Sequence, residues 1–60
     1  MSIRMLAIEL YRVMRRVQEL EKAFEGMNPG SPEREKTREE LRHLRAEENR
    51  LKAMLEGAKE

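Results

Sequence analysis

The chain has 60 residues, and 42% of them are charged, yet its formal net charge is only +1. It has no cysteine and a single histidine, which excludes disulfides, thiolate zinc sites and histidine-rich metal sites. Chains this short rarely bury a core that is sufficient for stability without a crosslink, a metal or a partner chain. Self-association is therefore the expected source of additional stability.

The first predicted element is a helix over residues 2–25. Its apolar residues recur at alternating steps of three and four, which is the spacing of the a and d positions in a coiled-coil heptad. The core residues predicted from this seam are Ile3, Leu6, Leu10, Val13, Val17, Leu20 and Phe24.

Residues 26–31 are predicted to form a turn. Gly26 suits a helix C-terminus in the left-handed backbone conformation, and Pro29 biases the residue before it away from the helical region. Ser31 followed by Pro32 is typical of a helix start, because the serine oxygen can cap free amides and the proline ring is pre-set for the first turn.

The second predicted helix covers residues 32–57 and carries a weaker seam. When the chain is folded back at the turn, the two seams align through seven layers, from Phe24 opposite Thr37 to Ile3 opposite Ala58. Neither helix alone requires this alignment. It predicts an all-α fold, an antiparallel two-helix coiled-coil hairpin that forms a single domain over residues 1–60. The core residues expected from the second helix are Leu41, Leu44, Leu51 and Leu55.

Charged residues beside the seams support the same register. In an antiparallel pair, g positions face g and e positions face e, so we expect Arg16 to face Glu47 and Glu21 to face Arg38. Opposite charges at both places favour this register over its alternatives, although an exposed pair contributes only about 0–1 kcal/mol.

Glu48 occupies a seam position opposite Val13 and is the fifth charge expected to set the register. A buried carboxylate without a partner is costly. We expect Glu48 to pair with Arg12 or Arg16 at the edge of the seam, or with an arginine of a second subunit, where a buried polar residue can fix the oligomeric state.

The first helix carries more apolar residues than one partner helix can cover. In water a stripe of this width is usually a contact surface. We expect it to form a homodimer interface that gives a four-helix bundle of two hairpins. Docking of a different helical protein is the alternative, with methionines supplying an adaptable surface. The predicted intersubunit or partner interface comprises Met5, Ala7, Ile8, Tyr11 and Met14.

A row of cations on the second helix, Arg38, Arg45, Lys52 and Lys59, raises nucleic-acid binding as an alternative function, because such a row could follow a phosphate backbone. Glutamates interrupt the row, and no aromatic residue on this helix is available to stack on bases. We expect the row to be a solvated face that also sets the pairing register.

Residues 1–18 raise peripheral membrane attachment as a second alternative, because four arginines there oppose the single acid Glu9 on an amphipathic helix. The apolar residues of this segment keep the seam spacing that matches the second helix. Protein packing therefore explains them better than membrane contact does.

Catalytic and metal-binding patterns are sparse. Glu40 and His43 have the Glu-x-x-His spacing of di-iron bundles, but His43 falls at an outward position and further inward carboxylates are missing. No nucleophile–base pair is found, so we expect no enzymatic activity, no cofactor and no metal. Glu9 and Arg12 interrupt the N-terminal apolar stretch that a signal peptide would need. The sequence predicts a small cytoplasmic module for protein–protein interaction.

Overall fold

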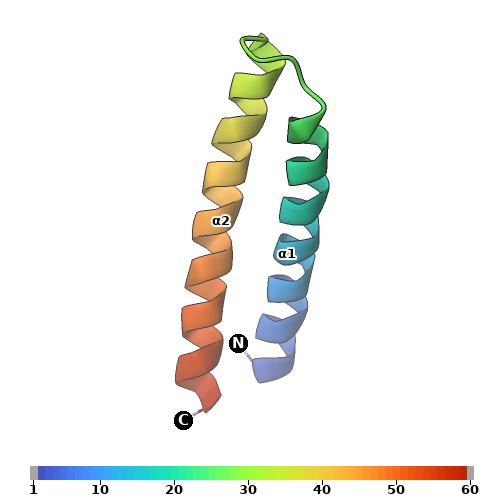
Figure 1. The fold of residues 1–60 in the computed structure, drawn as a ribbon. Helices are drawn as coiled ribbons and strands as arrows, with labels where there is room; N and C mark the ends of the chain where they lie inside the picture. Colours follow the sequence, from blue (N-terminus) through green and yellow to red (C-terminus); the bar gives the residue numbers. More distant parts are fainter. Residues whose placement is uncertain (1, 60) are drawn as a thin grey trace.

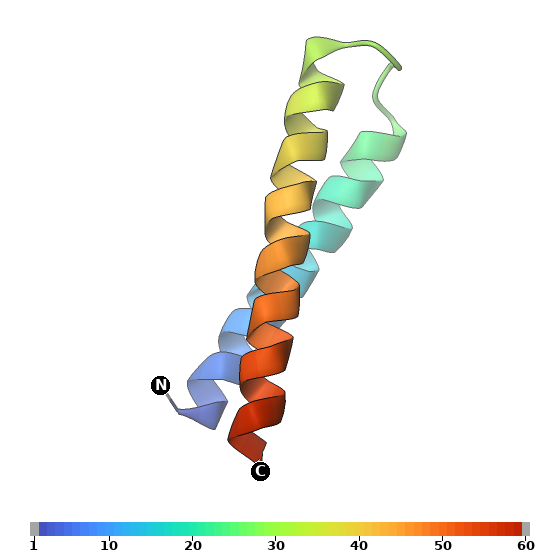
Figure 2. The same cartoon turned by 90° about the vertical axis from the view of Figure 1, so that its left-hand side faces the viewer.

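The chain folds into two helices that run in opposite directions and pack against each other. The computed structural model describes residues 2–59, which form α1 (Ile3–Glu25) and α2 (Pro32–Lys59). The beginning of α1 and the end of α2 lie at the same end of the molecule (Figure 1). The predicted helical hairpin is thereby confirmed. The two helices are inclined to each other (Figure 2) and form a rod with dimensions of 45 × 14 × 13 Å.

A serine begins each helix. The backbone of Ser2 is extended, and its hydroxyl accepts a hydrogen bond from the Met5 amide at 3.2 Å. The hydroxyl of Ser31 accepts one from the Arg34 amide at 3.1 Å. Each serine satisfies one of the amides that a helix N-terminus leaves without an intrahelical acceptor.

In the connection between the helices, the glycine with a left-handed backbone is not the predicted one. Gly26 has right-handed dihedral angles, with φ −86° and ψ −3°, and its amide donates to the carbonyl of Ala23, three residues back. A helix that ends in such a tightened turn needs no left-handed residue at that point. The left-handed residue is Gly30, with φ 89°.

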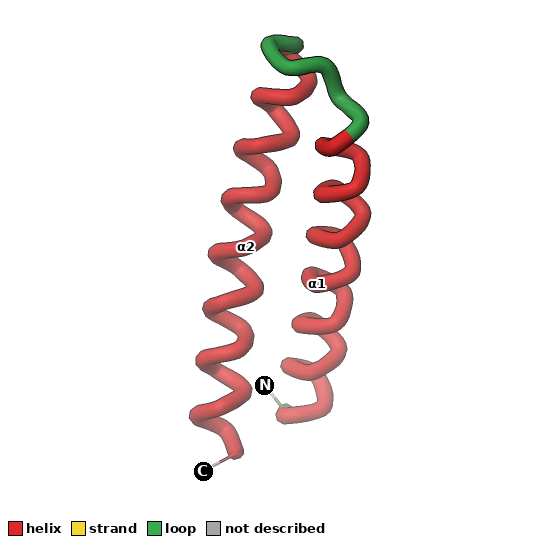
Figure 3. Tube along the Cα trace, in the orientation of Figure 1, coloured by secondary structure: helices red, strands yellow, loops and turns green. Residues whose placement is uncertain are grey.

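Gly30 belongs to a turn that starts at Asn28. The amide of Ser31 donates to the carbonyl of Asn28 at 3.2 Å, with Pro29 and Gly30 between them. Proline at the second position and a positive φ at the third are the features of a type II turn. This turn, in the loop of Figure 3, directs the chain into α2.

The core lies along the single line where the helices meet. Leu6 and Val17 of α1 are buried, as are Leu41, Leu51 and Thr37 of α2. With only two helices, each seam residue is covered from one side, so no large side chain among residues 2–59 is completely enclosed. The half-buried members of the predicted core are Leu10, Val13, Leu20, Phe24, Leu44 and Leu55.

The ion pairs that link the helices through Arg16 and Glu21 are not the predicted ones. Arg16 pairs with Glu40 at 3.9 Å, and Glu21 pairs with Arg45 at 2.5 Å. The observed partner of Arg16 lies seven residues before the predicted Glu47, and the observed partner of Glu21 lies seven residues after the predicted Arg38. A slip of one helix past the other would move both partners in the same direction along α2. The seam alignment is therefore not what changed.

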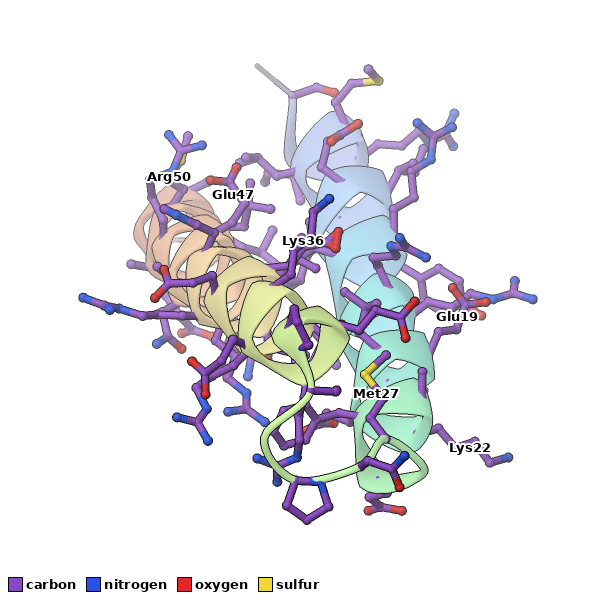
Figure 4. The ribbon with its side chains drawn as sticks, turned by 90° about the horizontal axis from the view of Figure 1, so that it is seen from above. Glu19, Lys22, Met27, Lys36, Glu47 and Arg50 are labelled. Carbon is purple, nitrogen blue, oxygen red and sulfur yellow. The ribbon has the colours of Figure 1, made fainter. Side chains whose placement is uncertain are left out.

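The predicted partners instead make ion pairs within α2. Glu47 pairs with Arg50 at 2.5 Å, and Arg38 pairs with Glu35 at 3.4 Å. Residues three apart on a helix are within reach however the helices pack. Figure 4 shows Glu47 and Arg50 together on α2. Their hydrogen bond and the charge of Glu47 raise the pKa of Arg50 above its usual value.

Glu48 also finds its partner on its own helix. Its carboxylate lies 2.8 Å from the ammonium of Lys52, and its side chain is only 18% exposed. The arginines that were expected to pair with it have other acids, Glu9 for Arg12 at 3.6 Å and Glu40 for Arg16. A lysine four residues after a glutamate is the favoured intrahelical order, and it neutralises the carboxylate without a second chain.

Candidate functional site

The predicted interface residues lie on the surface of α1. The exposed fractions are 51% for Met5, 42% for Ile8, 66% for Tyr11 and 37% for Met14, and Ala7 is also exposed. Within the hairpin, α2 packs against the seam and leaves these side chains uncovered. The largest exposed apolar area is thus concentrated in the first half of one helix.

Among the described residues, two further large apolar side chains are exposed near the end of the hairpin opposite the turn, which we call the open end. Ile3, which was expected in the core, is 49% exposed. Its expected opposite residue is Ala58, whose single methyl group is too small to cover it. Met54 is 41% exposed and was not predicted. The sequence feature that could have identified Met54 is its place in a row of residues spaced seven apart, in which the other members are glutamates.

A groove runs along the exposed face of α1. It lies between two ridges of side chains, each ridge built from residues four apart, and it encloses an open hollow of about 490 Å³. We call it the α1 groove. One ridge comprises Arg4, Ile8 and Arg12, and the other comprises Ala7, Tyr11 and Arg15.

The α1 groove is apolar at its centre and basic at its rim. Arg12 pairs with Glu9, at 3.6 Å. Arg4 and Arg15 have no ion pair or hydrogen bond to any side chain in the described part of the chain. Every other arginine has a carboxylate partner, except Arg34, which lies over an aromatic ring. The two arginines without a partner therefore both line this groove.

The cation row of α2 is compensated by acids. Arg38 pairs with Glu35 at 3.4 Å, Arg45 with Glu21 and Lys52 with Glu48. The side chain of Lys59, the fourth member of the row, lies outside the described residues. The described members of this row leave little uncompensated charge for a phosphate backbone.

A second hollow, of about 390 Å³, lies between the helices on the edge of α1 that carries Met14. We call this edge, with Ala7 and Met14 at its e positions, the e edge. The hollow is lined by Glu21 and Arg45, which pair with each other, and by Glu48, which pairs with Lys52. Its charges are therefore balanced, unlike those of the α1 groove.

Glu40 and His43 have separate surroundings. Glu40 pairs with Arg16, and His43 is exposed. Across residues 2–59, no group of three or more histidine, cysteine, aspartate or glutamate side chains is arranged to hold a metal ion. In the same range, neither helix has the length and apolar character needed to cross a membrane.

Comparison of the chain with protein-family models, with curated proteins and with solved structures finds no match.

Proposed function

We propose that this chain is a small non-enzymatic module for protein–protein interaction, an adaptor, regulator or assembly element that packs against other helices and forms a homodimer. The observation that carries the proposal is the set of large apolar side chains on α1 that α2 leaves uncovered, Tyr11 at 66% exposure above all. Exposed apolar side chains on one face of a helix are typical of a contact surface.

The surface area of the hairpin supports a homodimer. Its accessible surface is 4927 Å². A compact protein of 7.2 kDa is expected to expose about 4,100 Å². The excess of roughly 800 Å² equals what a standard interface removes from each partner. A second copy would therefore bring the exposed surface of each chain to the usual value.

The e edge is the part of α1 best suited to a second copy. Ala7 and Met14 adjoin the seam, so a second hairpin placed there would extend the existing core into a four-helix bundle. The charges along this edge are already paired, Glu21 with Arg45 and Glu48 with Lys52. A twofold axis brings the same edge of two copies together, and charges that are already paired within each chain repel each other less than unpaired charges would.

Sedimentation equilibrium tests the homodimer. The wild-type chain is expected to sediment at about 14 kDa, twice its 7.2 kDa mass. Met14→Glu is expected to raise the dimer dissociation constant on the order of tenfold or more, because it places a charge in the interface. Ala23→Glu adds the same charge on the g edge of α1 and should leave the mass unchanged. A folded wild-type monomer at millimolar concentration would refute the proposal.

A further inference from the structure

We propose that the α1 groove binds an acidic amphipathic helix of another protein. The inference rests on the proposed function, packing against other helices, and names the chemistry of one partner. It concerns the outer face of α1, whereas the e edge serves the homodimer. The two surfaces adjoin at Ala7, which belongs to both.

The shape of the α1 groove fits a helix. Helices pack by inserting a ridge of side chains spaced four apart into the groove between two such ridges of the other helix. The rows that start at Arg4 and at Ala7 form one groove of this kind. It extends from Arg4 to Arg15, roughly 16 Å along the axis. A partner helix of about three turns would fill this length.

The middle of each ridge is apolar. Ile8 on one ridge and Tyr11 on the other are both exposed, and the small side chain of Ala7 lies on the same ridge as Tyr11. A small residue between two larger ones lets the backbone of a second helix come close. The partner therefore requires a narrow row of apolar side chains, flanked by polar residues.

The rim of the groove selects the charge of that partner. Three arginines line it and no carboxylate does. Arg4 lies in the first turn of α1, where the helix dipole is positive and no acidic residue compensates it. Carboxylates on the partner would supply the missing partners of Arg4 and Arg15. Charge complementarity of this kind determines which partner binds and how fast.

A second copy of this chain is a poor occupant of the groove. In a twofold-symmetric dimer the same surface of each copy meets the other, so the inserted ridge would be one of the two that line the groove, and both end in arginine. Arginines of both copies would then face each other. An anionic membrane would satisfy the charges, but a bilayer favours a broad convex apolar face, whereas the apolar residues here line a groove between two ridges.

The test uses a fluorescent synthetic helix with a leucine stripe flanked by glutamates, and a control peptide with lysines in place of the glutamates. Fluorescence anisotropy is expected to show binding of the acidic peptide that weakens with salt, and no binding of the basic one. In the double variant Arg4→Glu, Arg15→Glu, affinity for the acidic peptide should fall roughly tenfold or more, and the basic peptide should now bind.

A matched variant separates the groove from net charge. Lys22→Glu, Lys36→Glu changes the net charge by the same amount at exposed positions outside the groove, and Lys22 projects from α1 away from α2 (Figure 4). This variant should bind the acidic peptide within about twofold of wild type. Circular dichroism verifies that each variant is folded. If the variant Arg4→Glu, Arg15→Glu unfolds, the variant Arg4→Gln, Arg15→Gln takes its place.

Three outcomes would overturn the inference. The first is absence of binding to the acidic peptide at millimolar concentration. The second is binding of the chain to phosphatidylglycerol vesicles without binding to the peptide. The third is loss of the homodimer in the Arg4→Glu, Arg15→Glu variant, which would place a second copy in the groove. The homodimer itself is measured without peptide, so either proposal can fail while the other stands.

Discussion

The guanidinium of Arg34 lies over the ring of Phe24, 4.1 Å from its centroid. The contact joins the first turn of α2 to the last turn of α1. Arg34 occupies a seam position, and both residues are half-buried. The arginine therefore covers the aromatic ring at the end of the hairpin where an apolar residue would be expected.

Replacing Arg34 tests this contact. Arg34→Ala is expected to lower the free energy of unfolding by about 0.5–1 kcal/mol or more, because it removes both the cation–π interaction and the cover of the ring. Urea denaturation followed by circular dichroism measures the change. Arg38→Ala removes an exposed arginine from the next turn and should cost less. Equal losses of unfolding free energy in the two variants would mean that the contact between Arg34 and Phe24 does not stabilise the hairpin.

Ser31 is expected to be the more important of the two helix caps. Ser31→Ala removes the oxygen that accepts from the Arg34 amide and should cost about 1 kcal/mol, whereas Ser31→Gly should cost only a few tenths. Ser2→Ala removes the corresponding bond at the open end, where fraying makes the loss smaller. The midpoints of urea unfolding for the three variants give the comparison, and a larger loss at Ser2 would contradict it.

The two glycines Gly30 and Gly57 should respond to alanine in opposite directions. Neither position has an atom within 4 Å of an added Cβ, so only backbone conformation differs. Gly30→Ala forces alanine into a positive φ of 89° and should cost about 1–2 kcal/mol. Gly57→Ala lies within α2 and should stabilise by about 0.5–1 kcal/mol. Thermal melting of both variants at equal concentration decides the signs.

Leu51 should dominate the stability of the open half of the hairpin. It is 4% exposed, and Leu51→Ala should cost about 2–5 kcal/mol. Such a loss leaves a domain of this size largely unfolded. The matched control is Met54→Ala on the same helix, at a side chain that is 41% exposed. It should change stability by no more than about 0.5 kcal/mol. Similar melting curves for the two variants would contradict the burial difference.

The heptad spacing and the turn residues were enough to predict the hairpin. The steps of three and four predicted both helices, and the segment around Pro29 predicted the reversal. Ser31 was identified as the start of α2, and its hydroxyl caps the helix at 3.1 Å. These features depend on residues within one or two turns of each other, so the local sequence contains the information that they require.

The sequence was less informative where several partners compete at similar energy. Arg16, Glu21 and Glu48 each have more than one opposite charge within reach, and exposed pairs differ by less than about 1 kcal/mol. The pairing of Arg16 with Glu40 and of Glu48 with Lys52 therefore emerged only once the side chains were placed. The same holds for the left-handed residue, because either Gly26 or Gly30 could adopt that conformation.

Periodicity and backbone preference act over short distances, so the amino-acid sequence alone predicts two amphipathic helices and the turn that folds one onto the other. The surface that remains uncovered and uncompensated depends on how the two helices pack. Arg4 and Arg15 became notable because the other arginines found partners, and a groove appeared between their ridges because α2 packs on a different face of α1. Both facts depend on the positions of residues distant in the chain, which local preferences do not encode.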